Sequence, residues 1–183
     1  MIWNEILCLG DSITYGARDR YGRSYPAELG KIMYENTGEF YYCHNYSVCG
    51  DTSSDLLRKA WNASCSHKEA KLALIMIGTN DTQKGIPEHI YEDNLRQIVS
   101  VVKVNGKFPI VATLPELSFT PLYLKNRDYI KKYNKIIKRL SSELSYEVCD
   151  MSHTEKYYID GVHYTHEGYN LIAQKFADKI LSL

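Results

Sequence analysis

Two kinds of hydrophobic pattern alternate along this chain. Short stretches with the character of strands are separated by longer segments in which apolar residues recur every three or four positions, the spacing of a helix face. The stretch 72–77 is apolar at every position, which is typical of a central parallel strand covered on both faces. We predict strands over residues 6–9, 41–47, 72–77, 109–114 and 146–149.

The segments between these strands carry helix start and stop signals. Gly38 is suited to ending the first helix, and Pro87 is suited to the first turn of a later one. Thr52, with Asp55 three residues on, resembles a capping box in which aspartate replaces glutamate. In the helix that follows this box, we expect four side chains to face the core: Leu56, Leu57, Ala60 and Trp61.

Strand and helix patterns alternate five times, which predicts an α/β fold. Right-handed βαβ units would build a five-stranded parallel sheet between two layers of helices, a three-layer sandwich. At 183 residues the chain is expected to form one domain, over residues 1–183. Ligands of such sheets bind beyond the carboxyl ends of the strands, so polar stretches at those positions are candidates for function.

Four polar stretches stand at strand ends or just before the last helix. They are Gly10–Thr14, Asn45–Thr52, Gly78–Asp81 and Asp160–His163. The first places Ser12 in a turn after an apolar strand, where glycine permits a tight turn and a following helix leaves N–H groups unpaired. Serine in a Gly/Asp turn is also ordinary turn chemistry, so the hypothesis of a catalytic serine depends on the other three stretches.

Charge and cysteine content narrow the classes of function. Lysine plus arginine equals aspartate plus glutamate at 22 each, which disfavours nucleic acid or an anionic membrane as a partner. No stretch approaches the roughly 18 apolar residues of a membrane span, and the first residues lack signal-peptide features, so we expect a cytoplasmic protein. The cysteines show no C-x-x-C spacing, and we expect no disulfide framework, no metal and no cofactor.

The four stretches, in this order, resemble the GDSL esterase/lipase family, also called SGNH hydrolases, over nearly the whole chain. The resemblance implies a flavodoxin-like fold with the strand order 2-1-3-4-5 and ester hydrolysis by a serine nucleophile. It implies Ser12 as the nucleophile, His163 as the base and Asp160 as the partner of the histidine. It also implies an oxyanion hole formed by the Ser12 backbone, Gly50 and Asn80.

The same residues make chemical sense without the resemblance. A serine hydroxyl is a poor nucleophile at neutral pH, and an imidazole that takes its proton contributes about 10² to 10⁴ in rate. Two residues separate Asp160 from His163, so the carboxylate can fold back onto the second ring nitrogen and fix the tautomer. Negative charge growing on the ester oxygen would meet the N–H groups of Ser12 and Gly50 and the amide of Asn80.

Some residues near these stretches receive other interpretations. Ile13 stands in place of the family's usual leucine, and Ser47 stands where many members have glycine; neither is a reacting group. Asp11, Asp51 and Asp81 each neighbour a proposed site residue, and we interpret them as helix-capping rather than catalytic.

The sequence favours a small-molecule ester with a short acyl group as substrate, acetylated carbohydrates included, because no long apolar lid segment is present. Tyr15 and Tyr164 flank the polar stretches, and their flat rings with polar tips make them candidates for substrate contact, although 16 tyrosines place some there by chance. The loop over residues 115–126 follows a strand, and we expect it to border the pocket.

Three other functions stay open. An acyltransferase would use the same residues on an acceptor other than water. A phosphate-binding or phosphoryl-transfer module would hold an anion at Asp11 and Ser12, but the chain has no G-x-x-x-x-G-K-[ST] loop and no second aspartate two residues after Asp11. A non-catalytic binding protein is the third, because fold alone does not imply function. The oligomeric state is not specified by the sequence.

Overall fold

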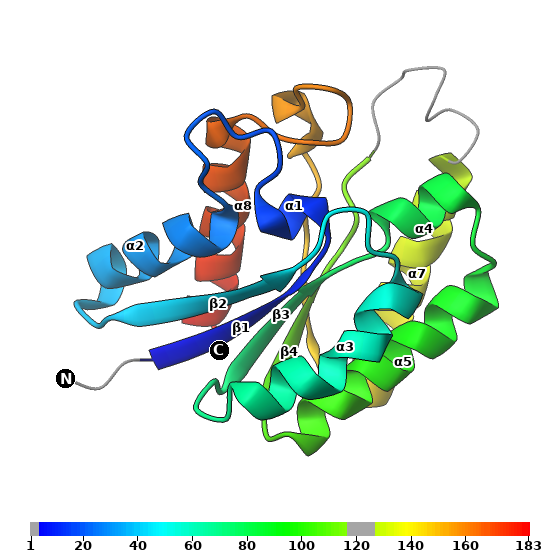
Figure 1. The fold of residues 1–183 in the computed structure, drawn as a ribbon, viewed down its shortest axis with the longest axis horizontal. Helices are drawn as coiled ribbons and strands as arrows, with labels where there is room; N and C mark the ends of the chain where they lie inside the picture. Colours follow the sequence, from blue (N-terminus) through cyan, green and yellow to red (C-terminus); the bar gives the residue numbers. More distant parts are fainter. Residues whose placement is uncertain (1–3, 117–126) are drawn as a thin grey trace.

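The computed structural model describes residues 4–116 and 127–183. Its centre is a five-stranded parallel sheet in the order β2-β1-β3-β4-β5 (Figure 1). The strands are β1 (Asn4–Gly10), β2 (Tyr41–Ser47), β3 (Leu72–Met76), β4 (Phe108–Ala112) and β5 (Glu147–Cys149). The predicted strand order is therefore confirmed.

Helices cover both faces of the sheet, as the alternating pattern predicts. They are α1 (Ser12–Tyr15), α2 (Tyr25–Thr37), α3 (Ser53–Ser66), α4 (Thr79–Lys84), α5 (Glu88–Val104), α7 (Arg127–Leu144) and α8 (His166–Leu181), with a short 3₁₀ turn η1 (Glu155–Tyr157). One side carries α2 and α8, and the other carries α3, α5 and α7 (Figure 1). Within the described ranges no helix is long and apolar enough to cross a membrane.

Alternate residues of each central strand enter two separate hydrophobic cores. In β1, Leu7 and Leu9 face the α3, α5 and α7 layer, whereas Ile6 and Cys8 face α2 and α8. All four side chains are almost completely buried. Because both faces of the sheet are covered, the central strands have no solvent-facing side, which explains the uniformly apolar run at 72–77.

The fourth strand ends earlier than predicted, and the reason is a side chain. Beyond Ala112 the Thr113 N–H still donates to the Cys149 carbonyl, but the Leu114 N–H donates to the Asn134 side-chain oxygen at 2.7 Å. The Asn134 amide in turn donates to the Leu114 carbonyl at 2.8 Å. An amide side chain from α7 thus satisfies the backbone where a neighbouring strand would otherwise pair.

Helix α3 confirms one prediction and corrects another. Thr52 and Asp55 form the predicted capping box, with the side chain of each bonded to the backbone of the other. Leu56 and Ala60 are fully buried, but Trp61 is 52% exposed, so the prediction that Trp61 faces inward is wrong. Successive helix residues differ by about 100° around the axis, and the position after Ala60 has already turned away from the core.

Replacing Gly10 by alanine is expected to destabilise the fold strongly. A Cβ at Gly10 would lie 2.1 Å from the Thr14 hydroxyl oxygen and 2.6 Å from the backbone oxygen of Met76. The Met76 backbone belongs to a central strand and cannot yield, so Gly10→Ala should lower the free energy of unfolding by about 3 kcal/mol, measured by urea denaturation.

Gly106→Ala is the matched control for this change. A Cβ at Gly106 meets no atom within 4 Å, and only its φ of 74° adds strain, about 1 kcal/mol. A Gly10→Ala variant as stable as the Gly106→Ala variant would contradict the close packing described at the end of β1.

Candidate active site

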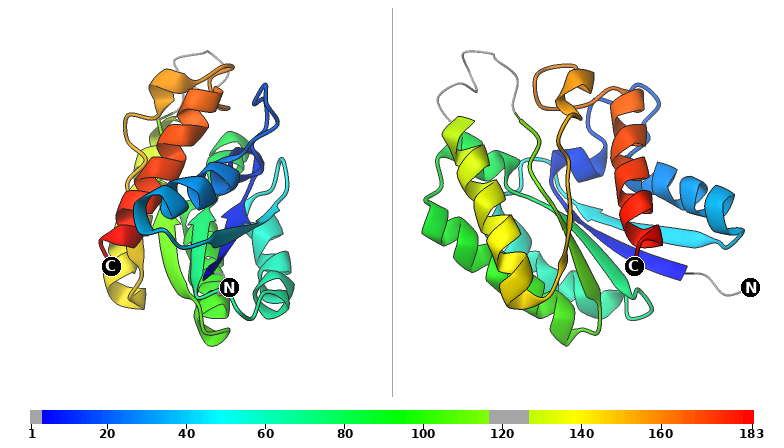
Figure 2. Two further views of the ribbon diagram at one scale, coloured as in Figure 1. Left: turned by 90° about the vertical axis from the view of Figure 1, so that its left-hand side faces the viewer. Right: turned by 180° about the vertical axis from the view of Figure 1, so that it is seen from behind.

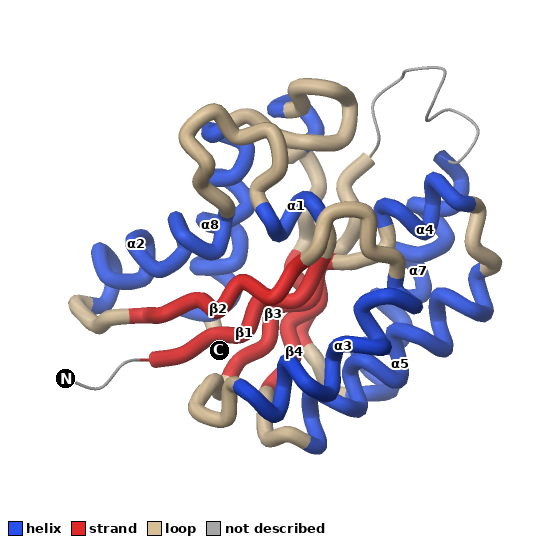
Figure 3. The backbone as a smooth tube through the Cα atoms, viewed as in Figure 1, coloured by secondary structure: helices blue, strands red, loops and turns tan. Residues whose placement is uncertain are grey.

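The four polar stretches meet at one end of the molecule. The segments that follow β1, β2 and β3 come together above the carboxyl edge of the sheet (Figure 3). The loop after α1 and the loop before α8 lie side by side at the same end (Figure 2). Residues more than a hundred positions apart therefore become neighbours, as a parallel sheet with this strand order requires.

Ser12 is the first residue of α1 and is separated from the end of β1 by Asp11 alone. The Asp11 carboxylate caps this short helix by accepting from the Ile13 N–H at 3.0 Å. The Ser12 carbonyl accepts from the Ala17 N–H at 2.9 Å, which closes the turn. Asn45, from β2, donates its amide to the Thr14 carbonyl at 2.9 Å, so α1 is anchored to the sheet as well.

The structure brings Ser12, His163 and Asp160 together in a line. The Nε2 atom of His163 lies 2.9 Å from the Ser12 Oγ, and its Nδ1 atom lies 2.8 Å from an Asp160 carboxylate oxygen. The other Asp160 oxygen accepts from the backbone N–H of His163 at 2.8 Å and of Val162 at 3.1 Å. The carboxylate therefore holds both the loop and the imidazole ring.

Hydrogen bonds keep Asp160 ionised. Burial alone would raise the pKa of this carboxyl, but the backbone and ring N–H groups of His163 and the N–H of Val162 outweigh it, and the pKa lies below its usual range. A carboxylate held in this way can fix the histidine tautomer, with the proton on Nδ1 and the lone pair of Nε2 directed at the serine.

The proposed oxyanion donors lie around the same turn. Gly50 has a φ of 86°, and a Cβ there would meet no atom within 4 Å, so this stretch of backbone is open to a ligand. The loop containing it is tied to β1 because the Val48 N–H donates to the Gly10 carbonyl at 3.4 Å. Asn80, in α4, directs its amide to the Asp51 carbonyl at 2.8 Å and to the Asp11 carboxylate at 3.4 Å.

The three neighbouring aspartates differ in their partners. Asp11 caps α1, as predicted. Asp81 accepts from the N–H of Ser53 at 2.8 Å and from its hydroxyl at 2.5 Å, so it serves the start of α3 rather than its own helix. Asp51 pairs with Lys59. The sequence did not indicate the Asp81–Ser53 pair, because its members lie 28 residues apart.

The two tyrosines predicted to contact substrate differ in their exposure to solvent. Tyr15 is 58% exposed at the end of α1, which leaves its ring free to meet a ligand. Tyr164 has no exposed surface, and its hydroxyl bonds the Thr154 side chain at 2.9 Å, so the prediction that it contacts substrate is wrong. The ring also packs edge-on against Tyr169 of α8, which makes it part of the core.

Sequence reasoning missed Arg18, which lies beside the line of three residues. Its Nε atom is 3.7 Å from the Asp160 carboxylate, and its φ of 71° is uncommon for a residue with a side chain. No motif signals this position; the loop geometry alone brings it there. Most of the predicted pocket-bordering loop, residues 117–126, lies outside the described residues.

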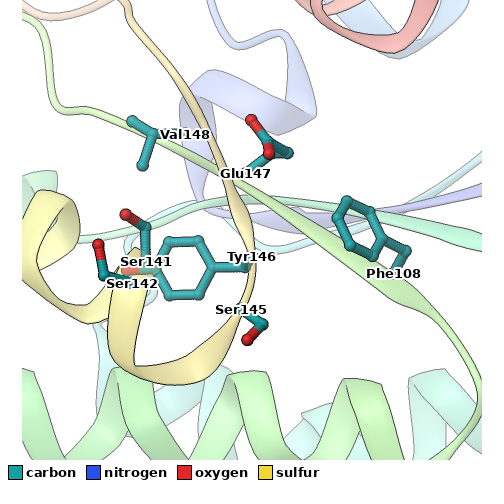
Figure 4. Close-up of a pocket in the computed structure, with 7 residues that line it drawn as sticks. All are labelled: Phe108, Ser141, Ser142, Ser145, Tyr146, Glu147 and Val148. Carbon is teal, nitrogen blue, oxygen red and sulfur yellow. The ribbon is translucent and has the colours of Figure 1, made fainter. Parts of the chain in front are cut away.

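A cavity of about 550 Å³ lies far from this arrangement (Figure 4). Its lining includes Phe108 and Glu147, the first residues of β4 and β5. Ser12 follows the opposite, carboxyl end of a parallel strand. The size of the cavity therefore has no bearing on the serine, and the hydrogen-bonded side chains mark the candidate active site instead.

Comparison with known proteins gives the family. The GDSL-like lipase/acylhydrolase family matches residues 8–171. An arylesterase of Vibrio mimicus is 30% identical over 102 residues, which cover 56% of this chain and half of the arylesterase. The "Thioesterase 1/protease 1/lysophospholipase L1" of Escherichia coli is 26% identical over 186 residues, covering 98% of this chain and 85% of that protein.

Solved structures share the fold at low identity. A lipase/acylhydrolase from Enterococcus faecalis superposes with a TM-score of 0.84 at 22% identity, covering 98% of this chain and 96% of that one. A carbohydrate acetylesterase from Sinorhizobium meliloti gives 0.83 at 19% identity, covering 98% and 99%. The family match spans most of the sequence, so this chain belongs to the GDSL-like lipase/acylhydrolase family and is a carboxylic ester hydrolase.

Proposed function

We propose that the protein hydrolyses small or short-acyl carboxylic esters, acetylated carbohydrates among them, through an acyl-enzyme on Ser12. The observation that carries this proposal is the 2.9 Å contact between His163 Nε2 and Ser12 Oγ, with Asp160 bonded to the other ring nitrogen. A nucleophile within reach of a base, and a base oriented by a third group, is the arrangement that acyl transfer requires.

The reaction has two halves, formation of the acyl-enzyme and its hydrolysis. His163 Nε2 accepts the Ser12 proton while Oγ bonds the carbonyl carbon, and the same proton then passes to the departing alcohol as the ester bond breaks. In the second half, water gives a proton to His163 and attacks the acyl carbon, and Ser12 recovers its proton as the carboxylic acid leaves. Asp160 stabilises the imidazolium formed in each half.

Three donors are proposed to stabilise the oxyanion: the N–H groups of Ser12 and Gly50 and the amide of Asn80. Two of these lie on backbone fixed by the Asp11 cap and by the bond between the Val48 N–H and β1, so they need little reorganisation. Such preorganisation stabilises the transition state more than the bound ester, and it therefore acts on kcat.

The relatives support the choice of a short acyl group. The structurally similar carbohydrate acetylesterase is named for acetyl esters of carbohydrates, and the arylesterase is named for aryl esters. Tyr15 stays a predicted contact for such a substrate. The cytoplasmic location, the single domain, the absence of a cofactor and the choice of water over another acyl acceptor also stay predictions.

Ser12→Ala is expected to abolish ester hydrolysis, because it removes the hydroxyl that lies 2.9 Å from His163 Nε2 and is proposed to receive the acyl group. The rate of p-nitrophenol release from its acetate ester should fall at least about 10³-fold. Ser142→Ala, at the rim of the distant cavity, is the matched control and should keep full activity. A Ser12→Ala variant within tenfold of the wild type would remove Ser12 from the mechanism.

Asn80→Ala should lower kcat by about 10² to 10³-fold while KM stays within a few-fold, since one oxyanion donor is lost. Steady-state kinetics with the same acetate ester measures both constants. Asn36→Ala on the surface of α2 is the control for removing an amide elsewhere. An Asn80→Ala effect confined to KM would show that the amide binds ground-state ester instead.

Substrate preference is expected to follow acyl length. In a series of p-nitrophenyl esters, kcat/KM should be highest for acetyl and butyryl groups and fall steeply toward decanoyl, and acetylated xylooligosaccharides should release acetate. Adding an alcohol acceptor measures the partition between transfer and hydrolysis. A maximum at decanoyl would contradict the short-acyl proposal without affecting the role of Ser12.

A further inference from the structure

A buried carboxyl group stands directly before the proposed nucleophile and takes no part in the chemistry described above. Asp11 is 1% exposed. One of its oxygens accepts from the Ile13 N–H, which caps α1, and the other lies 3.4 Å from the Asn80 amide nitrogen. One side chain therefore touches both the helix that carries Ser12 and the residue proposed to complete the oxyanion hole.

The Asn80 amide is held from two sides. Its nitrogen carries two hydrogens, and its two acceptors here are the Asp51 carbonyl at 2.8 Å and the Asp11 carboxylate at 3.4 Å. The first bond is short and goes to backbone next to Gly50. The second is long, so the N–H directed at Asp11 can be shared with a nearby oxyanion, as in a three-centre bond, while both acceptors keep the amide plane in place.

The cap alone does not explain a carboxylate at this position. Asparagine caps helices as well as aspartate does, and it carries no charge that must be buried. The charged groups that act most strongly on Asp11 are the carboxylates of Asp81 and Asp51. Burial and these two charges raise the pKa of Asp11 to about 7, against the opposing effect of the Ile13 N–H.

Other titratable groups also face Asp11. They are the thiol of Cys49 in the Gly50 loop and the phenols of Tyr91 on α5, Tyr164 before α8 and Tyr169 on α8. None of these groups supplies a positive charge. The fold therefore keeps an acidic group where an ionised carboxylate is unfavourable, although a neutral cap would serve the helix.

We propose that Asp11 is a positioning residue of the oxyanion hole: its carboxylate holds the Asn80 amide in the orientation that meets the developing oxyanion. The inference rests on the proposed esterase function of Ser12 and Asn80. Asp11 touches no reacting atom and acts only through the Asn80 side chain. Ionisation strengthens this hold, because a carboxylate oxygen is a stronger acceptor than a carboxyl group that has gained a proton.

This role predicts that stability and activity change in opposite directions as the pH rises. Because the pKa of Asp11 in the fold lies above its usual value, the folded protein holds a proton that the unfolded chain loses between about pH 4 and 7. The contribution of Asp11 to stability therefore falls as the pH rises through that range. Activity rises over the upper part of the range, as the carboxylate forms.

Asp11→Asn separates the two effects, because the new side chain can still accept from the Ile13 N–H. At pH 8 we expect kcat for p-nitrophenyl acetate to fall at least tenfold with KM within about twofold, while the unfolding temperature stays equal or rises. As the pH falls below neutral, the ratio of wild-type kcat to Asp11→Asn kcat should shrink toward about one, because the wild-type carboxyl gains a proton and the amide of the variant does not.

A double-mutant cycle with Asn80→Ala tests whether Asp11 acts through Asn80. In the Asn80→Ala background, Asp11→Asn should change kcat by less than about twofold. Full additivity of the two changes, or an unchanged kcat in the Asp11→Asn single variant, would overturn the inference. If instead Ser12→Ala keeps its activity, the proposed function itself fails, so the two failures are distinguishable.

Discussion

The hydrogen bond between His163 and Ser12 is the interaction on which the rest of this structure depends. It joins residues 151 positions apart, and no local sequence preference can form it. It exists because β1 runs through the centre of the sheet and delivers Ser12 at its carboxyl end, while the loop before α8 returns over the same edge. The two buried cores that clamp the central strands therefore also fix the distance between the His163 ring and the Ser12 hydroxyl.

Near this bond, buried polar side chains anchor the loops through directed hydrogen bonds, which apolar packing cannot supply. Asp81 bonds the start of α3 through Ser53, and Asn94 of α5 donates to the same Ser53 hydroxyl at 2.9 Å, so the loop that carries Gly50 is anchored from two helices. The donors to Asp11 are the Ile13 N–H at 3.0 Å and the more distant Asn80 amide at 3.4 Å. Burial raises the pKa of both Asp81 and Asp11, so two carboxyl groups lie where ionisation is unfavourable, as expected where stability has been given up for function.

The fold and the catalytic candidates were largely predictable because they depend on local signals repeated along the chain. Uniform apolar runs mark strands covered on both faces, and four polar stretches mark their ends. Trp61 and Tyr164 were misplaced because helix phase and burial depend on neighbours that composition does not reveal; Tyr164 is buried by Tyr169 and Thr154. Arg18 and the Asp81–Ser53 pair arise only from tertiary geometry.

The central claim is that Ser12 is a nucleophile activated by His163, and covalent labelling tests it most directly. After incubation with a fluorophosphonate, peptide mass spectrometry should find one phosphonyl group, on the peptide that contains Ser12, and a His163→Ala protein should label far more slowly. An adduct on a different serine, or a fully active enzyme that forms no adduct, would contradict the account.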